Sequence, residues 1–252
     1  MRMLSLSTVL LYGFLHAPLL VLALFSFNEG RFTVWEGFSL RWYAEAWRDA
    51  RLMEAAGNSL GIAAAATALA TVAGTLCAYG LWKRGSRLLM TGLTVSLVTP
   101  EIVTGIALLA LFQWLFRHAG LQLGLHTVIL AHVSFCLAFV VLVVLARLRT
   151  VDASLEEAAM DLGAREWEAF LRVTLPNLLP AVLSAALLSF TISFDDYVIT
   201  SLVAGVDTET LPMVLYAMAR RGGSPVVNAI STLVVVLLGA GILLSEALRK
   251  KA

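Results

Sequence analysis

Long apolar runs alternate with short polar segments along the whole chain. About 20 helical residues at 1.5 Å each cross a hydrocarbon layer of ~30 Å, so each run of that length predicts a membrane-spanning helix. Backbone amides in lipid must find partners within their own segment, which makes helices the expected form. The pattern predicts an all-α membrane protein with six transmembrane helices in a single domain over residues 1–252, with spans at about Thr8–Phe27, Asn58–Trp82, Leu88–Phe116, His126–Ala146, Leu178–Ala204 and Val226–Leu248.

Composition agrees with this pattern. Hydrophobic residues make up 60% of the 252 residues and charged residues 14%, whereas soluble domains hold roughly 45–50% and about 25%. The apolar excess excludes a disordered chain, a disulfide scaffold and a free-standing cytosolic enzyme. The first run is longer than the core of a signal peptide, so we expect it to be retained. Cys77 and Cys136 lie in apolar runs without metal-binding or CxxC spacing.

The distribution of charge predicts the orientation. If the N-terminus is cytoplasmic, eleven basic residues lie in inner segments and seven in outer ones. All three lysines, Lys83, Lys250 and Lys251, fall on the inner side. Because basic residues concentrate in cytoplasmic loops, both termini are expected in the cytoplasm. The net charge of +1 leaves no basic field for nucleic acid.

The outer segment 28–57 is rich in aromatic residues among mixed charges. It predicts a short amphipathic helix at the membrane interface, where tryptophan and tyrosine are favoured. The alternative is a docking surface for an outside partner. The aromatic residues concerned are Trp35, Trp42, Tyr43 and Trp47.

The longest inner segment, 147–177, is far more polar than its surroundings and predicts two short helices joined at Gly163. Ser154 and Glu157 match a capping box at the start of the first helix, and Gly163 supplies a left-handed turn at its end. The second helix is expected over 165–174 and to stop before Pro176, which would open the fifth span. Local physics alone is sufficient to explain each of these residues.

Their combination is more specific. Glu157-Ala158-Ala159, three residues, Gly163, nine residues, Val173, one residue and Leu175-Pro176 resembles the EAA motif of ABC importer permeases, with valine in place of isoleucine. The resemblance implies a cytoplasmic coupling segment at about 150–176, which docks in a groove on a separate ATP-hydrolysing subunit. A rigid helix–turn–helix can pass a partner's motion to the spans on either side. The coupling residues implied are Glu157, Ala158, Ala159, Gly163, Leu175 and Pro176.

Other stretches extend the resemblance over most of the chain, to the PotC-like permeases of bacterial spermidine/putrescine importers. It implies a type I ABC importer permease in the bacterial inner membrane, which carries polyamines by alternating access. It also implies a heterodimer with a second, related permease, an ATPase dimer that binds ATP and Mg, and a periplasmic binding protein, with no cofactor in this chain itself. The stretches are Phe25–Asn28, Pro100–Gly105, Ser193–Val198, Thr210–Met213, Arg221–Pro225 and Asn228-Ala229.

Three acidic residues fall inside predicted spans: Glu101, Asp195 and Asp196. A charged aspartate at the bilayer centre costs about 2.5–3.5 kcal/mol, so these carboxylates need a partner, a water-filled cavity or a proton. No basic residue is evident inside a span to pair with them. Glu101 follows Pro100, which is expected to disturb the helix at a depth where broken helices line protein or a cavity.

These acids are candidates for the path of a cation, because carboxylates can replace the hydration of a linear ammonium chain. Phe190, Phe194 or Tyr197 could add a cation–π contact. The alternative is structural: the two aspartates cap the end of a span or pair with Arg220 or Arg221 in the last outer loop. Successive helix residues point about 100° apart, so both aspartates cannot face the path equally.

Motifs for catalysis are absent from the sequence. There is no GxxxxGK[ST] phosphate loop, no HExxH and no GxSxG, so neither ATP hydrolysis, a metal site nor catalysis is expected of this chain. Three alternatives stay open: a stand-alone secondary transporter or channel, although no internal repeat is evident; an intramembrane enzyme that uses the acids; and an EAA-type permease for another solute. Three intramembrane acids favour a cation.

Overall fold

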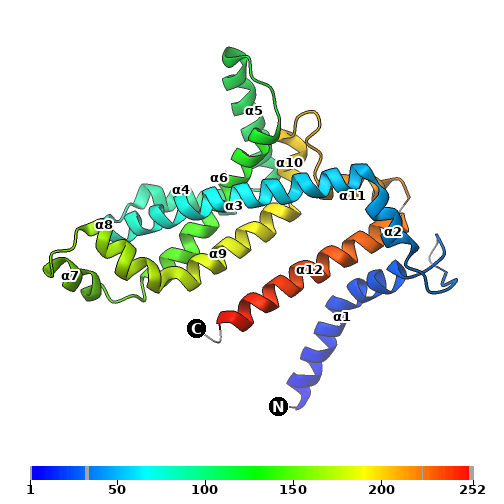
Figure 1. The fold of residues 1–252 in the computed structure, drawn as a ribbon, viewed down its shortest axis with the longest axis horizontal. Helices are drawn as coiled ribbons and strands as arrows, with labels where there is room; N and C mark the ends of the chain where they lie inside the picture. The colour runs from blue at the N-terminus through cyan, green and yellow to red at the C-terminus, as the bar shows by residue number, and fades with distance from the viewer. Residues whose placement is uncertain (1, 32–33, 223, 250–252) are drawn as a thin grey trace. The chain divides into compact units, whose positions relative to one another are not determined.

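The computed structural model describes residues 2–31, 34–222 and 224–249, and its regular elements within these ranges are helices (Figure 1). They form two compact units, one of residues 1–56 and 211–252 and the other of residues 57–210. The all-α prediction is thereby confirmed. Lys250 and Lys251, on which the predicted orientation partly depends, and Gly223 of the Arg221–Pro225 stretch lie outside the described residues.

The first unit is built around the contact of its first helix with its last, which lie side by side (Figure 1). The predicted amphipathic helix of the outer segment is present as α2, which packs on α12. Trp42 differs from the interfacial prediction, since it is only 2% exposed and donates from Nε1 to the carbonyl of Asn28 at 2.6 Å. The helices of this unit are α1 (Arg2–Ser26), α2 (Arg41–Arg48), α11 (Leu211–Arg220) and α12 (Pro225–Arg249).

The second unit has its core where α6 packs against α9 and α3. Small residues let α3 approach α6: a Cβ atom at Gly74 would lie 2.7 Å from the Cβ of Val140, so close packing depends on the missing side chain. Its elements are most of α3 (Ala50–Arg84), then α4 (Arg87–Val98), α5 (Glu101–Ala119), α6 (Leu125–Leu148), α7 (Ser154–Asp161), α8 (Glu166–Ala169), the π-helical turn η1 (Phe170–Thr174), α9 (Leu175–Asp195) and α10 (Val198–Val203).

Several helices are long and apolar enough to cross a membrane. Four qualify singly, over Ser7–Ser26, Ala50–Arg84, Leu125–Leu148 and Glu166–Asp195. The pair α4 and α5 makes a fifth candidate, and the described apolar part of α12, Pro225–Gly241, is shorter. The described residues therefore contain four or five candidate spans, whereas the count of six and the side of the termini stay predictions.

Two of the predicted spans are broken rather than straight. The chain bends by 113° between α4 and α5. A break is expected from Pro100, because a residue before proline is pushed out of the helical region, and Thr99 has ψ 129°. The predicted span Leu88–Phe116 is thus two helices. The span predicted at Leu178–Ala204 also divides, since Asp196 is extended, with ψ 126°, between α9 and α10.

The polar segment forms the predicted hairpin, with α7 and α8 joined at Gly163, whose φ is +96°. Two details differ from the prediction. The start of α7 is capped by Asp152, whose Oδ1 accepts from the Ser154 N–H at 3.0 Å, and not by the Ser154 side chain. The second helix does not stop before Pro176, because the turn η1 joins α8 to α9 in one run. This wider turn accommodates a proline that cannot complete an α-helical hydrogen bond.

Candidate functional site

The two helix breaks of the second unit meet at a pocket of about 360 Å³. The end of α4, the start of α5, one face of α6 and the α9–α10 corner line it, and it brings together Glu101, Asp195 and Asp196. Irregular backbone at membrane depth is tolerated where it is buried in protein or lines a cavity. We call this site the acidic pocket; it brings together the three acids that the sequence places inside predicted spans.

The two aspartates of the acidic pocket have different surroundings. The Asp196 side chain is 6% exposed, and its Oδ2 accepts hydrogen bonds from the Thr200 amide at 2.8 Å and the Thr200 hydroxyl at 2.7 Å. Asp196 therefore caps the start of α10, which lies inside the predicted span Leu178–Ala204 and not at its end. Asp195 and Glu101 are solvent-exposed, so they are the members of the set that a solute can reach.

Asp196 also has a basic partner that was not expected from the sequence. His132 of α6 is 1% exposed, and its Nε2 lies 3.4 Å from Asp196 Oδ2. The same ring places Nδ1 2.7 Å from the Ser193 hydroxyl and Nε2 2.9 Å from the Thr200 hydroxyl. The expectation that no basic residue inside a span could pair with the acids is therefore wrong for Asp196, because the imidazole of His132 lies beside it. This network fixes the α9–α10 corner to α6.

The aromatic residues proposed for the path do not line the pocket. Phe194 is buried and stacks on Phe190, with ring centroids 6.1 Å apart, and Tyr197 is not among the lining residues either. The aromatic rings of the pocket are instead Phe135 and Phe139 of α6. They lie three and seven residues after His132, so all three residues are on one helix face. This spacing is the sequence pattern from which the two aromatic residues could have been predicted.

A close contact between α5 and α10 holds the pocket together. A Cβ atom at Gly105 would lie 2.6 Å from Leu202 Cδ1 and 3.4 Å from Ile199 Cα. Glycine at the end of the Pro100–Gly105 stretch thus lets α10 pack directly on α5. This contact sets the distance between the start of α5, which carries Glu101, and the corner that carries both aspartates.

The hairpin of the EAA-like motif is a second candidate site. Glu157, Ala158 and Gly163 are exposed, and Ala159 is half-buried. Leu175 is half-buried and Pro176 exposed at the base of α9. Apolar side chains are also open to solvent there, and Leu162 is 90% exposed. Exposed apolar residues gathered on an otherwise polar segment mark an interaction surface; the others are Leu155, Trp167 and Leu171.

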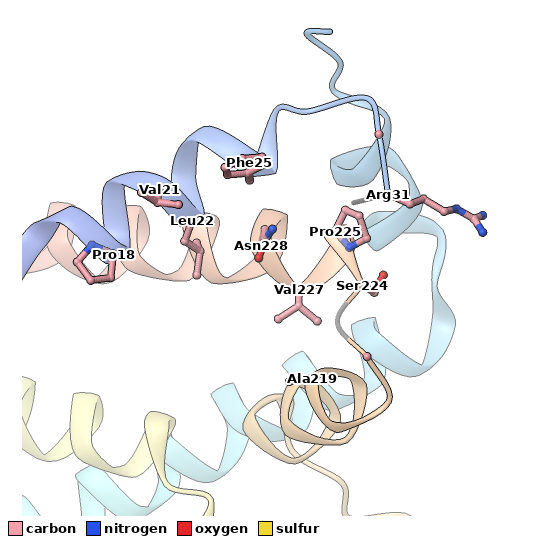
Figure 2. A pocket seen from close by; sticks show the side chains of 12 residues that line it. Pro18, Val21, Leu22, Phe25, Arg31, Ala219, Ser224, Pro225, Val227 and Asn228 are labelled. Carbon is pink, nitrogen blue, oxygen red and sulfur yellow. The ribbon is translucent and has the colours of Figure 1, made fainter. Parts of the chain in front are cut away.

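The first unit contains a cavity of a different kind, of about 590 Å³. Figure 2 shows apolar side chains of α1 beside Asn228 of α12, whereas the side chains of Val227 and Arg31 extend away from them. None of the described residues that line it is acidic. This cavity therefore lacks the negative charge that distinguishes the acidic pocket.

Comparison with known proteins decides the family. Residues 70–250 match the model of the family described as the inner membrane component of binding-protein-dependent transport systems. The chain belongs to this family. Membership confirms that this permease is a multi-pass protein of the bacterial inner membrane and a transport subunit rather than an enzyme.

Two curated relatives are similar over nearly the whole permease. It is 45% identical over 240 residues to the putrescine transport system permease protein PotI of Escherichia coli strain K12, covering 92% of this chain and 85% of that protein. It is 40% identical over 244 residues to the spermidine/putrescine transport system permease protein PotC of Haemophilus influenzae, covering 95% and 93%. The resemblance to PotC-like permeases is thus confirmed.

Solved structures show the same fold. A chain of a bacterial ABC transporter involved in the import of the acidic polysaccharide alginate superposes with a TM-score of 0.77 at 13% identity, covering 99% of this permease and 94% of that chain. A chain of the alginate transporter in complex with a periplasmic protein bound to an alginate pentasaccharide gives 0.69 at 15% identity, covering 94% and 90%. The fold is that of an ABC importer permease.

Proposed function

We propose that this permease forms part of the path by which an ATP-driven importer carries putrescine or spermidine across the inner membrane. The observation that carries the proposal is the exposure of Glu101 and Asp195 in one pocket at two helix breaks. A linear polyamine must give up water to enter the membrane, and two carboxylates replace that hydration with charge-assisted hydrogen bonds. The faces of Phe135 and Phe139 add cation–π attraction. The names of the PotI and PotC relatives support the same cargo.

The proposed architecture has six spans, with both termini in the cytoplasm, in one permease domain over residues 1–252. The spans are α1, α3, the bent pair α4 and α5, α6, α9 with α10, and α12. Broken helices that meet near the middle of a membrane are typical of transporters, in which half-helix ends and irregular backbone surround the substrate. Alternating access would open the acidic pocket to one side of the membrane at a time.

The proposed partners are a second, related permease, an ATPase dimer that binds ATP and Mg, and a periplasmic binding protein that delivers the polyamine. The exposed apolar side chains of the hairpin support docking of the ATPase there. In this assignment Glu157, Ala158, Ala159, Gly163, Leu175 and Pro176 act as the coupling residues. The periplasmic protein seen with the alginate transporter supports the last partner by analogy of fold.

Uptake by the complete complex in proteoliposomes tests the proposal. We expect labelled putrescine or spermidine to accumulate only with ATP and the binding protein, and unlabelled polyamine but not a neutral sugar to compete. The double substitution Glu101→Gln with Asp195→Asn should lower uptake at least tenfold without loss of the ATPase from the complex. Uptake without the ATPase would indicate a stand-alone transporter, and failure of every polyamine to enter or compete would indicate another cargo.

A further inference from the structure

The residue before the EAA-like motif, Glu156, is buried although its neighbour Glu157 is exposed. The Glu156 side chain is 3% exposed, and acidic side chains are almost never this buried unless they are paired. Its Oε1 accepts a hydrogen bond from the Tyr79 hydroxyl and lies 2.9 Å from Lys83 Nζ. Its Oε2 accepts from the Thr174 hydroxyl at 2.8 Å. Both carboxylate oxygens are thus occupied within the chain.

These partners come from elements that are far apart in sequence. Tyr79 and Lys83 lie in the last turns of α3, and Thr174 closes η1, the turn that leads into α9. The Tyr79 ring also packs on Phe170 at the start of η1, with centroids 4.5 Å apart. One carboxylate on α7 therefore joins the hairpin to the ends of two predicted spans.

The chemistry of these hydrogen bonds favours a stable connection between Glu156 and its partners. Hydrogen bonds that involve a charged partner are shorter and stronger than neutral ones, and Glu156 makes them in two directions at once. Burial raises the pKa of Glu156, but the hydrogen bonds from Tyr79, Lys83 and Thr174 and the charge of Lys83 lower it below its ordinary value overall. Glu156 is therefore ionised at neutral pH. π-Helical turns such as η1 occur frequently at functional sites.

We infer that Glu156 is a positioning residue of the transport cycle, which ties α7 to the cytoplasmic end of α3 and to η1 so that a displacement of the hairpin moves the base of α9. This inference rests on the proposed function. The exposed face of the hairpin, with Glu157, meets the ATPase, whereas Glu156 faces inward and passes the movement on. Loss of the Glu156 carboxylate should leave the ATPase docked on the hairpin but prevent the movement of the hairpin from reaching α9.

The test uses the complete complex with the variants Glu156→Gln, Lys83→Met and the two combined. Arg84→Met is the matched control, because Arg84 is the exposed neighbour of Lys83 on the same helix end. We expect Glu156→Gln to lower uptake per assembled complex at least tenfold, while the ATPase co-purifies and hydrolyses ATP at half its normal rate or more. The combined variant leaves no charge unpaired, so its failure to recover uptake would show that the connection itself matters. Arg84→Met should change uptake less than twofold.

A second readout does not depend on the cargo. A cysteine replaces the exposed Leu179 of α9, and its labelling by a maleimide is followed with and without ATP and vanadate. We expect the labelling rate to change with nucleotide in the parent complex and not in Glu156→Gln. If the parent complex imports no polyamine, the proposed function fails, and this labelling still decides the role of Glu156.

Three results would overturn the inference. The first is normal uptake per complex in both Glu156→Gln and the combined variant. The second is a loss of uptake that equals the loss of assembled complex, since Glu156 would then serve folding alone. The third is a nucleotide-dependent labelling change at position 179 that survives Glu156→Gln.

Discussion

The hairpin and the acidic pocket each contain two adjacent acids, and in each pair the two carboxylates have opposite surroundings. Glu156 is buried and hydrogen-bonded while Glu157 is exposed; Asp196 is buried and hydrogen-bonded while Asp195 is exposed. In α7 consecutive side chains leave the helix about 100° apart, whereas Asp195 ends α9 and Asp196 is extended; in both pairs the neighbours face different ways. The comparison indicates different roles for the two acids of each pair: the buried acid holds the local structure through hydrogen bonds, and the exposed acid is available to a partner or solute.

The two buried acids differ in the partners that neutralise them. Glu156 pairs with Lys83, which lies at a helix end where its side chain keeps 27% exposure. Asp196 depends on the amide and hydroxyl of Thr200 and on His132. In the proposed six-span architecture Asp196 lies within a span and Glu156 lies outside one, and an ammonium group is costly inside a membrane. Hydrogen-bond donors and an imidazole in place of a lysine are consistent with that proposed placement of Asp196.

The largest loss of uptake is expected from a substitution that disrupts the turn of the hairpin and leaves Glu156 and Glu157 unchanged. Proline is fixed at φ near −65° and cannot adopt the φ of +96° at Gly163, so Gly163→Pro should abolish uptake and detach or uncouple the ATPase. Gly163→Ala, which carries a strain of about 1–3 kcal/mol, should give an intermediate loss. Uptake assays and co-purification of the ATPase provide the measurement. Normal transport with normal ATP hydrolysis in Gly163→Pro would make the coupling assignment wrong.

A smaller effect is expected from the buried acid of the pocket. Asp196→Asn removes a charged acceptor from the Thr200 and His132 network, and bonds of that kind contribute about 1.5–3 kcal/mol each. We expect the purified complex to unfold at a lower temperature, because the α9–α10 corner loosens. Asp195→Asn is the matched control and should leave the unfolding temperature within one degree. Equal stability losses in the two variants would remove the distinction between them.

The smallest effect is a pH dependence of the hairpin. The pKa of Glu156 in the folded chain is below its ordinary value of 4.5, so its stabilising contribution is complete above that value and is lost as the pH falls through it towards the folded-state pKa. Limited proteolysis of the hairpin between pH 7 and pH 4 should show faster cleavage at the lower pH values. Glu156→Gln should cleave faster at pH 7 and lose part of this dependence.

Asp152 also contributes to the pH dependence of the hairpin, so the proteolysis experiment needs a variant that removes its contribution. Hydrogen bonding from Ser154, chiefly from its backbone N–H, also lowers the pKa of Asp152, so both acids contribute in the same direction. Asp152→Asn separates the two contributions. An acid dependence that disappears in Asp152→Asn and persists in full in Glu156→Gln would contradict the role given to Glu156.

Much of the fold could be predicted from the sequence because the governing forces are local. Apolar length indicates which helices can cross lipid, Pro100 disfavours a helical residue before it, and glycine at 163 permits a left-handed turn. The helix boundaries near Pro176 were less predictable. Whether a proline ends a helix or is accommodated by a π turn depends on packing, here the contact of Phe170 in η1 with Tyr79.

The candidate site could be predicted only in part, for a related reason. Acids in apolar runs are conspicuous, so the sequence alone singles out Glu101, Asp195 and Asp196. It does not single out His132, because a lone histidine in a span has many ordinary roles. Glu156 is inconspicuous beside the exposed motif that follows it. Its importance depends on Tyr79 and Lys83, which lie more than seventy residues away.

The central claim, that the exposed acid of the pocket meets a cationic solute, is tested most directly by changing the charge of Asp195 at nearly constant shape. ATP-dependent uptake of labelled putrescine would be compared, per assembled complex, for the parent protein, Asp195→Asn and Asp195→Glu. The account predicts at least a tenfold loss for the asparagine variant and recovery of a substantial part of it with glutamate. Equal uptake by all three complexes would contradict it.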